Sequence, residues 1–533
     1  MPKATVNNQV IEFDASEQLN CIQAAKKIGF EVPHYCWHPE LSVVASCRMC
    51  LVEVGDTKPD GTVVMQPKLV PGCQTPVKEG TVVLADSPKV KAAQAATLEY
   101  LLLNHPLDCP TCDQAGECGL QDYSYKYGRG YSRLQEPKNQ KPDKDHIGEQ
   151  ITLFTDRCIM CTRCVRFTRE ISGTAELFVT HRGTKEEIDV FPGEPCDNKL
   201  AGNVVDLCPV GALCSKDFLY EQRVWWLNSA KSVCPNCSTG CSITVDQNED
   251  VVYRLKPREN PQAQGHFMCD EGRFGWKYQQ REDRLAYPEQ REAGRVVSYG
   301  WDDILPALRK QLQSTKGDRI GALLSPWMTV EEAYLLASFL TEISEHVRLA
   351  VAPAAIVGSD DRYPKDFRGQ PLEPTKFTIR AEKAPNARGV DAVLKHFAKS
   401  PLTMSDLLAQ ASSGKLDALY LVGGDPNGWI TAQQADAVKK VPLVVVQDIL
   451  PSAVSPLAQY LLPGGTFAER DGVFVNHAGL AQEIHRAVRC PEGARPDGRI
   501  LWDLSGRPGL FNAAQLRKEI AAPPASSATV AFG

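Results

Sequence analysis

The distribution of cysteines constrains this chain more than any other feature of its sequence. Of its 19 cysteines, 18 lie before residue 270 and only Cys490 follows. The first ten residues lack the charged region and apolar core of a signal peptide, so we expect a reducing compartment in which disulfides are rare. Closely grouped cysteines in such a setting favour metal ligands. The sequence therefore divides into a metal-rich front half and a metal-poor back half.

The overall composition is that of a soluble protein with several globular domains. The chain has 533 residues, of which 43% are hydrophobic and 23% charged, so it can bury several apolar cores. Its formal net charge of −6 argues against nucleic-acid binding, which usually needs a basic surplus. No apolar run reaches the roughly 18–20 residues that cross a bilayer, so membrane contact is expected only through a complex.

The first group of cysteines has the spacing C-x10-C-x2-C-x22-C. A C-x2-C pair presents two thiolates from one tight loop, and one upstream and one distant ligand complete a set of four. In a β-rich setting this pattern predicts a [2Fe–2S] cluster, with a structural zinc site as the alternative. Cys21 lies on the apolar side of a predicted helix and is expected in the core. The predicted ligands are Cys36, Cys47, Cys50 and Cys73.

The second group combines a histidine with three cysteines in the spacing H-x3-C-x2-C-x5-C. No fourth cysteine lies nearby, and the histidine follows a predicted helix just before the first cysteine. We therefore predict a [4Fe–4S] cluster with one imidazole ligand, which makes a cluster less negative and raises its potential. The alternative is a capping or surface histidine, with zinc or nothing bound. The predicted ligands are His105, Cys109, Cys112 and Cys118.

The third and fourth groups each contain four cysteines. The third has C-x2-C-x2-C followed, 44 residues on, by C-P, which is the bacterial ferredoxin signature of a [4Fe–4S] cluster. The fourth has C-x2-C-x3-C-x27-C and predicts a further [4Fe–4S] cluster, with zinc as its main alternative. Cys196, Cys214 and Cys490 remain unassigned. The predicted ligands are Cys158, Cys161, Cys164 and Cys208 for the third group, and Cys234, Cys237, Cys241 and Cys269 for the fourth.

Local patterns predict the elements of the front half. Asn7 and Asn8 indicate the turn of a β-hairpin. A helix is predicted to begin with Ser16 as its N-cap and to stop at Gly29. A second helix, with Pro88 near its start, is expected to lead to the histidine of the second group.

From about residue 290 the sequence alternates between strands and helices. This βαβ pattern predicts a largely parallel sheet covered by helices. Gly423 and Gly424 follow a predicted strand and indicate a plain turn, since no G-x-G-x-x-G fingerprint supports the alternative of a nucleotide site. Residues 355–390 match no element, and the tail 521–533 is expected to be irregular.

With these motifs, the chain resembles the large iron–sulfur subunit family of respiratory complex I, which is the family of the G subunits of bacterial NADH-quinone oxidoreductases. The resemblance covers residues 1 to about 280 strongly, and is weaker in LLPGGTFAERDGVFVNHAGLAQ, which resembles a molybdopterin-oxidoreductase-like domain. It rests on VPHYCWHPELSVVASCRMCLVEV, NHPLDCPTCDQAGECGLQD, DRCIMCTRCVRF, GNVVDLCPVGAL, CPNCSTGCSITV and MCDEGRFGWKY.

The resemblance implies a multidomain fold of α+β and α/β parts. It implies one [2Fe–2S] cluster in the first group and three [4Fe–4S] clusters in the others, the fourth lying off the main electron path. The expected domains are a β-grasp [2Fe–2S] ferredoxin-like domain at 1–85, a [4Fe–4S] domain with one histidine ligand at 86–135, a [4Fe–4S] ferredoxin-like domain at 150–225, a further [4Fe–4S] domain at 230–285 that starts the molybdopterin-oxidoreductase-like region, and a shortened molybdopterin-oxidoreductase-like α/β domain at 286–533.

The resemblance further implies a subunit of NADH:quinone oxidoreductase that carries electrons and has no catalytic residues or substrate site of its own. Electrons would arrive from the flavin-bearing, NADH-oxidising subunit and leave toward the quinone-reducing subunits. The implied partners are that subunit, a small [2Fe–2S] subunit, a [4Fe–4S] subunit leading to quinone and the quinone-site subunits. The implied location is peripheral, on the cytoplasmic side of the inner membrane.

Three other functions stay open at this point, one of which is a structural zinc protein, opposed by the ferredoxin signature of the third group. A molybdopterin-dependent formate dehydrogenase subunit shares the fold, but its metal usually takes a thiolate early in the last domain, and no cysteine lies between residues 270 and 489. An electron-carrying subunit of an NAD-linked hydrogenase would resemble the first 220 residues or so.

Overall fold

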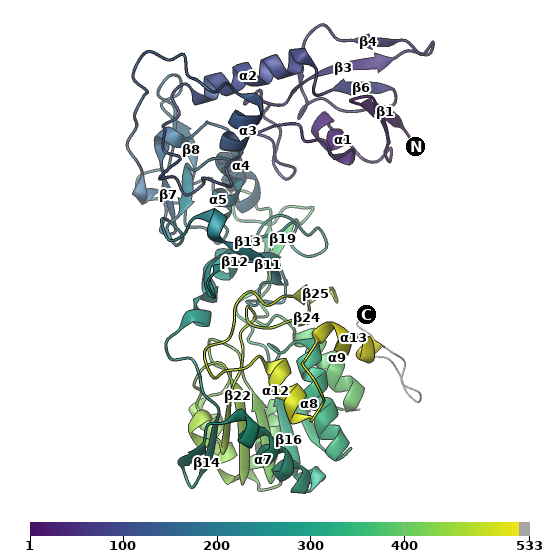
Figure 1. Ribbon diagram of the computed structural model, residues 1–533, viewed down its shortest axis with the longest axis vertical. Coiled ribbons are helices and arrows are strands. Elements are labelled where there is room, and N and C mark those ends of the chain that lie inside the picture. Colours follow the sequence, from purple (N-terminus) through teal and green to yellow (C-terminus); the bar gives the residue numbers. More distant parts are fainter. Residues whose placement is uncertain (399, 522–533) are drawn as a thin grey trace. The chain divides into compact units, whose positions relative to one another are not determined.

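The computed structural model describes residues 1–398 and 400–521 (Figure 1). The chain forms two compact units: Met1–Trp226 together with Tyr363–Pro374, and Leu227–Arg362 together with the chain from Thr375 onward. From residue 522, the tail predicted to be irregular lies outside the described residues. Within the described ranges no helix has both the length and the apolar character to cross a bilayer.

The first unit begins with a mixed sheet packed against one helix. Its strand order is β2-β1-β6-β3-β4, with β1 and β6 parallel, the other neighbours antiparallel and β5 paired to β3. Val6, Val52 and Val83 of the strands share one apolar core with Ala24 and Ala25 of α1. This arrangement confirms the predicted β-grasp domain. Its elements are β1 (Lys3–Val6), β2 (Gln9–Glu12), α1 (Cys21–Lys27), β3 (Leu51–Thr57), β4 (Val63–Met65), β5 (Val70–Pro71) and β6 (Thr81–Leu84).

The prediction of Ser16 as the N-cap of the first helix is wrong. The helix begins four residues later, where the Asn20 side chain accepts from the Gln23 amide and the Gln23 side chain accepts from the Asn20 amide. This reciprocal capping box satisfies two amides that the Ser16 position cannot reach, and the Ser16 hydroxyl is bound to Asp14 instead. The predicted stop is confirmed, since Gly29 follows the C-cap with φ of 72°.

The rest of the first unit consists of short elements joined by long loops. α2 begins at Pro88 as predicted, because the Ser87 hydroxyl accepts from the Val90 amide and so caps its first turn. Two small antiparallel pairs, β7 with β10 and β8 with β9, complete the sheet structure. The elements are α2 (Pro88–Leu102), α3 (Gly119–Tyr127), β7 (Ile151–Leu153), α4 (Arg163–Phe167), β8 (Phe178–Thr180), β9 (Glu187–Asp189), α5 (Asn203–Leu207) and β10 (Leu213–Ser215).

Part of the stretch that matched no element, residues 363–374, belongs to the first unit although both of its neighbours in the chain belong to the second. The Lys365 amide donates to the carbonyl oxygen of Ile171 at 3.0 Å. The backbone also passes so close to Gly173 that a Cβ there would lie 2.5 Å from the carbonyl oxygen of Asp366. This segment therefore packs as an integral part of the first unit.

The second unit begins with a three-stranded antiparallel sheet and a short helix. A second, larger sheet of eight strands has the order β15-β14-β23-β22-β21-β16-β17-β20. The small elements are β11 (Asn228–Val233), β12 (Ser242–Asn248), β13 (Val251–Pro257) and α6 (Asp270–Phe274), with β18 (Asp361–Tyr363) and β19 (Phe377–Ile379) flanking the segment 363–374. The hairpin β24 (Gly472–Val475) and β25 (Ala481–Ile484) lies outside the large sheet.

The large sheet confirms the predicted parallel sheet. All neighbours from β23 to β20 are parallel, and β14 alone runs against the rest, since it is antiparallel to both β23 and β15. Because the parallel part begins at the central strand β16, moves outward through β17 to β20 and returns through β21 to β23, the sheet is doubly wound. Its strands are β14 (Glu289–Glu292), β15 (Arg295–Ser298), β16 (Ile320–Leu324), β17 (Arg348–Val351), β20 (Leu402–Thr403), β21 (Ala418–Val422), β22 (Leu443–Asp448) and β23 (Tyr460–Pro463).

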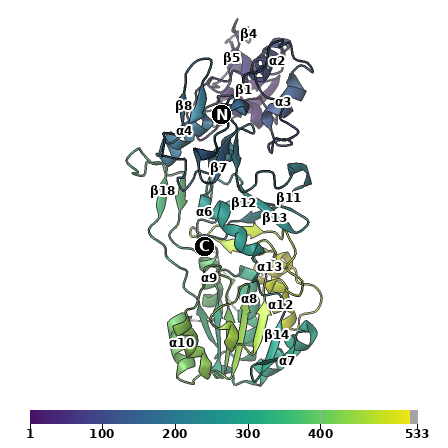
Figure 2. The same ribbon diagram turned by 90° about the vertical axis from the view of Figure 1, so that its left-hand side faces the viewer.

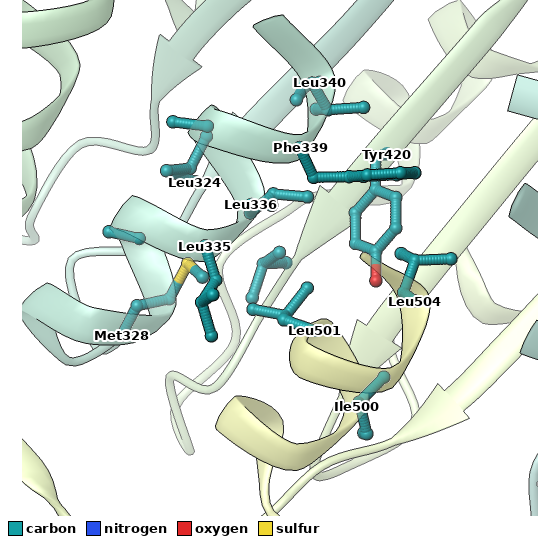
Figure 3. Packing of buried hydrophobic residues seen from close by; sticks show 14 of the residues in the cluster. Leu324, Met328, Leu335, Leu336, Phe339, Leu340, Tyr420, Ile500, Leu501 and Leu504 are labelled. Atoms are coloured by element: carbon teal, nitrogen blue, oxygen red, sulfur yellow. The ribbon is translucent and has the colours of Figure 1, made fainter. Parts of the chain in front are cut away.

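Helices cover both faces of this sheet. Tyr420 and Val445 belong to the core that includes α8 and α12, whereas their neighbours Leu421 and Val446 belong to the core that includes α10. Figure 2 shows α10 and α8 on opposite sides of the strands, and Figure 3 shows side chains of α8 and α12 gathered around Tyr420. The helices are α7 (Trp301–Ser314), α8 (Val330–Ile343), α9 (Ala387–Phe397), α10 (Met404–Ser412), α11 (Ala432–Asp436), α12 (Asp497–Leu504) and α13 (Ala513–Ala521).

A buried ion network lies beside the carboxyl ends of the central strands. Arg470 Nη1 lies 3.1 Å from both Glu332 Oε2 and Asp497 Oδ2, and Nη2 donates to the carbonyl oxygen of Trp327 at 2.6 Å. Glu332 is 0% exposed, and burial raises its pKa to about 7 although Arg470 opposes the shift. Removal of one member of such a network leaves a buried charge that no solvent can compensate.

Glu332→Ala should therefore lower the free energy of unfolding of the second unit by about 3 kcal/mol, the low end of the usual range because Asp497 still pairs with Arg470. Hydrogen exchange of the β21 and β22 amides measures this change. Asp417→Asn is the matched control, because its pair with Arg319 is about one-third exposed and should cost less than about 1 kcal/mol. Equal effects of the two substitutions would contradict the role given to the network.

Candidate metal-cluster sites

The first cysteine group lies in loops of the β-grasp domain, between α1 and β3 and just after β5. Cys47 and Cys50 lie in the loop that enters β3, and this loop turns sharply because Arg48 adopts φ of 57°. Hydrogen bonds from the Cys47 and Cys73 thiols hold the pKa of Cys36 well below its usual range. A hydrogen bond with Cys73 likewise lowers the pKa of Cys50. The structure thus brings all four predicted sulfur ligands of the first group together.

The second group lies between α2 and α3. Cys118 is the N-cap residue of α3. Burial raises the pKa of its thiol to about 11; backbone hydrogen bonds oppose this rise, and the neighbouring Cys112 and Cys109 add to it. Cys109 is the exposed member of the group. Burial, and next the charges of Lys138 and Arg157, lower the pKa of His105 to about 4. The imidazole is therefore neutral at pH 7, which is the form that binds metal, but its contact with the three sulfurs stays a prediction.

The third group encloses an apolar cavity. All four of its cysteines line this cavity, together with Leu153, Ile188 and Leu213. Met160 and Thr162 have φ of 51° and 59°, which lets the C-x2-C-x2-C segment wrap around the cavity before α4 begins. Burial raises the pKa of Cys158 to about 12 and of Cys161 to about 11, with Cys208 contributing next in both cases.

The fourth group lies in the second unit, at the ends of three elements. Cys234 follows β11, Cys241 precedes β12, and the amide of the first donates to the carbonyl oxygen of the second at 2.8 Å. Cys269 caps the start of α6, where its Sγ accepts from the Gly272 amide at 3.4 Å. A Cβ at Gly272 would lie 2.9 Å from Cys234 Sγ, so the absence of a side chain there leaves room for both sulfurs. After burial, the charges of the other three cysteines raise the pKa of Cys241, so the four thiols of this group lie near one another.

The donor chemistry of these groups fits iron–sulfur clusters. Burial raises the pKa of most of the thiols, so a metal that displaces their protons is needed to make them thiolates at neutral pH. Soft thiolate donors in fours are the ligands that [2Fe–2S] and [4Fe–4S] clusters prefer. Among the residues that the structure describes, no three His, Cys, Asp or Glu side chains form a group suited to a single metal ion.

The unassigned cysteines are buried or half-buried and lie outside these groups. The Cys21 thiol donates to the carbonyl oxygen of Thr75 at 3.4 Å and belongs to the β-grasp core, as predicted. The Cys214 thiol donates to Gly211 at 3.6 Å. Cys490 lines a groove of the second unit.

Sequence reasoning missed three arginines beside the cysteines, of which Arg157 and Arg166 are buried and Arg163 is largely so. Arg157 donates to Asp108 at 2.9 Å, and its guanidinium stacks on the Phe154 ring at 3.9 Å. The other two occur within the third group itself, in the run C-T-R-C-V-R. The sequence could have indicated them, because both arginines lie between predicted ligands of the third group.

The carboxyl edge of the large sheet is where ligands of doubly wound sheets bind, at the point where the chain changes direction. The cavity there is lined by Trp327, Asp448, Arg470 and Asp497 among others, and by no cysteine. Gly423 and Gly424 also line it, and the Gly424 amide donates to the Asp448 side chain at 2.9 Å. Because no thiol lines the cavity and Arg470 is already paired within it, these residues do not fit a molybdenum–pterin group.

Five family models match the chain in succession. They are described as a 2Fe-2S iron-sulfur cluster binding domain (residues 3–88), an NADH-ubiquinone oxidoreductase-G iron-sulfur binding region (94–133), an NADH-quinone oxidoreductase subunit 3 ferredoxin-like domain (148–214), a molybdopterin oxidoreductase Fe4S4 domain (227–281) and molybdopterin oxidoreductase (373–507). Each of the four ligand groups falls inside one of the first four matches. These matches confirm the predicted kinds and order of the domains.

Individual relatives agree with these matches. The chain is 39% identical over 346 residues to the G subunit of the NADH-quinone oxidoreductase of Rickettsia bellii, an alignment that covers 64% of this chain and 48% of the relative. It is 37% identical over 334 residues to the NADH-ubiquinone oxidoreductase 75 kDa subunit of Reclinomonas americana, covering 62% and 47%. The chain therefore spans about half the length of the curated relatives it matches.

A solved structure, an NAD+-reducing [NiFe]-hydrogenase in the H2-reduced state, is 26% identical and covers 42% of this chain and 91% of its own. Its TM-score of 0.36 is too low to establish a shared fold. Over about two thirds of its length, the chain is thus a relative of the G subunits of NADH-quinone oxidoreductases, with the iron–sulfur and molybdopterin-oxidoreductase domains in one polypeptide.

Proposed function

We propose that this chain is an electron-transfer iron–sulfur subunit of NADH:quinone oxidoreductase. It relays single electrons from the flavin-bearing subunit toward the subunits that reduce quinone. One [2Fe–2S] cluster and three [4Fe–4S] clusters carry the electrons, held by the sixteen ligands predicted from the sequence. The observation that carries the proposal is the succession of four ligand groups, each inside its own iron–sulfur family match.

Contacts within the first unit support a path from the first group to the third and then to the second. Arg166 donates to the carbonyl oxygens of Cys36 and Cys161, which are ligands of the first and third groups. Pro209 follows the last ligand of the third group, and its carbonyl oxygen lies 3.9 Å from Cys118 Sγ of the second. Close approach favours electron transfer between centres. The fourth group lies in the second unit, and we place it off this path.

The proposed partners are the flavin-bearing NADH-oxidising subunit, the small [2Fe–2S] subunit, the [4Fe–4S] subunit that leads to quinone and the quinone-site subunits. We place the chain in the peripheral part of the complex, on the cytoplasmic side of the inner membrane. The oxidation of NADH by quinone thus belongs to the assembled enzyme, and this chain contributes the transfer of electrons between its clusters. A molybdopterin-dependent activity is disfavoured because no thiol lines the cavity at the switch point.

Cys161→Ala should remove one tetranuclear EPR signal and abolish electron flow from NADH to quinone, because a cluster that lacks one of four thiolates is not retained. Low-temperature EPR of the isolated chain and turnover of the assembled complex measure the two effects. Cys214→Ala is the control, since this buried thiol is outside the ligand groups and should preserve every signal. Turnover at the wild-type rate in C161A would refute the path.

His105→Cys should preserve assembly and lower the midpoint potential of one tetranuclear centre, because a thiolate adds negative charge where a neutral imidazole was bound. An EPR-monitored redox titration measures the shift. An unchanged titration would show that His105 is not a ligand.

Gly211→Ala should destroy the cluster of the second group. A Cβ at this position would lie 2.2 Å from Cys112 Sγ, so the sulfur has to leave its place. The EPR signal of the second group should disappear while the binuclear signal remains. Gly130→Ala is the matched control because nothing lies within 4 Å of the added carbon. Full retention of iron in G211A would contradict the assignment.

A further inference from the structure

Two arginines of α4 lie between the first and third ligand groups. α4 starts between two ligands of the third group, and Arg163 and Arg166 are three residues apart on it. Side chains with this spacing share one face of a helix. Both guanidinium groups therefore extend in a common direction from the loop that carries the third group.

Each arginine connects backbone from both groups. Arg166 Nη2 donates to the carbonyl oxygens of Cys36 and, at 3.2 Å, of Cys161. Its Nη1 donates to the carbonyl oxygen of Ser42 at 2.5 Å.

Arg163 repeats this pattern one helical turn earlier. Its Nη2 donates to the carbonyl oxygen of Trp37, and its Nη1 to that of Leu207 at 3.3 Å. Trp37 follows the first ligand of the first group, and Leu207 precedes the last ligand of the third. We call Arg163 and Arg166 the arginine bridge.

The positive charge of this bridge is not balanced by carboxylates. Arg166 is 8% exposed, and in the described part of the chain the acceptors that bind the two guanidinium groups are backbone carbonyl oxygens, with no carboxylate among them. The Glu170 carboxylate accepts from the Ser42 amide and hydroxyl, whereas Arg166 donates to the Ser42 carbonyl oxygen. The Nε atoms of both arginines are buried without a hydrogen-bond partner. A buried cation next to a half-buried one is costly unless an anion faces them.

The nearest candidates for that anion are the ligand sulfurs. Cys161, Cys208 and Cys36 are the thiols whose charges act on Arg163. Thiols bound to iron are deprotonated, and clusters with four thiolates carry net negative charge. If the first and third groups hold clusters, the bridge has a negatively charged centre in each of the two ligand groups that it connects.

We propose that Arg163 and Arg166 are positioning residues that serve as a shared counter-charge for the clusters of the first and third groups. They raise the potentials of both clusters and hold the two ligand loops together. This inference rests on the proposed function, since it requires both clusters. Reduction adds an electron to an already negative cluster, so a buried cation nearby stabilises the reduced state. Loss of one cation should thus affect both centres and spare the other two.

The test is Arg166→Gln in the full chain, followed by EPR-monitored redox titration. The midpoint potentials of the binuclear centre and of the tetranuclear centre that C161A lacks should both shift downward. The remaining tetranuclear signals should titrate as in the wild type. Arg169→Gln is the matched control, because this exposed arginine lies three residues further along the chain and should shift neither potential.

Unchanged potentials in R166Q, or a shift in only one of the two centres, would overturn the shared counter-charge. If R166Q does not retain iron, Arg166→Lys separates charge from hydrogen bonding. Retention of both clusters by R166K supports the counter-charge, whereas loss in both variants would show that the forked hydrogen bonds matter and would overturn it. A wild-type chain without a binuclear signal would refute the proposed function itself, and a wild type with all signals beside an unshifted R166Q refutes only the bridge.

Discussion

The convergence of buried sulfur atoms is the constraint on which the rest of the first unit depends. Burial raises the pKa of the Cys164 and Cys208 thiols, so both stay protonated at neutral pH unless a metal takes the proton's place. Loops with left-handed residues such as Arg48 and Thr162 hold such thiols in groups of four. Irregular backbone of this kind is costly on its own, and bonds to iron are what we expect to stabilise it. We therefore expect folding and cluster binding to be coupled in this unit.

The second unit, in contrast to the first, has a large sheet whose stability does not depend on a bound metal. Its doubly wound sheet has the topology that commonly binds ligands at the switch point, yet Arg470, Glu332 and Asp497 occupy that place as a paired network. The apolar faces represented by Tyr420 and Leu421 stabilise the sheet without any cofactor. The sheet is thus suited to serve as a scaffold, and the function proposed for this chain requires only the sulfur ligands.

The arginine bridge joins the packing of the ligand loops to electron transfer. A conducting series needs centres that are both close and matched in potential. Arg166 meets both needs at once, because it binds the ligand loops of two groups and places one charge between them. A residue without any bond to iron can thus matter for the potential of a cluster.

The kinds of donor, their grouping and most local elements could be predicted from the sequence. C-x2-C spacing is a property of a single loop, and the alternation of strands and helices after residue 290 is likewise local. The N-cap at Asn20 was missed because Ser16 offers similar capping chemistry four residues earlier, and only the reciprocal bond with Gln23 decides between them. Only the folded chain reveals that residues 363–374 join the first unit, that the third group lies between the first and the second, and that Arg470 fills the switch point. These contacts join residues far apart in the chain, and their geometry depends on the packing of whole elements, which no spacing of residues encodes.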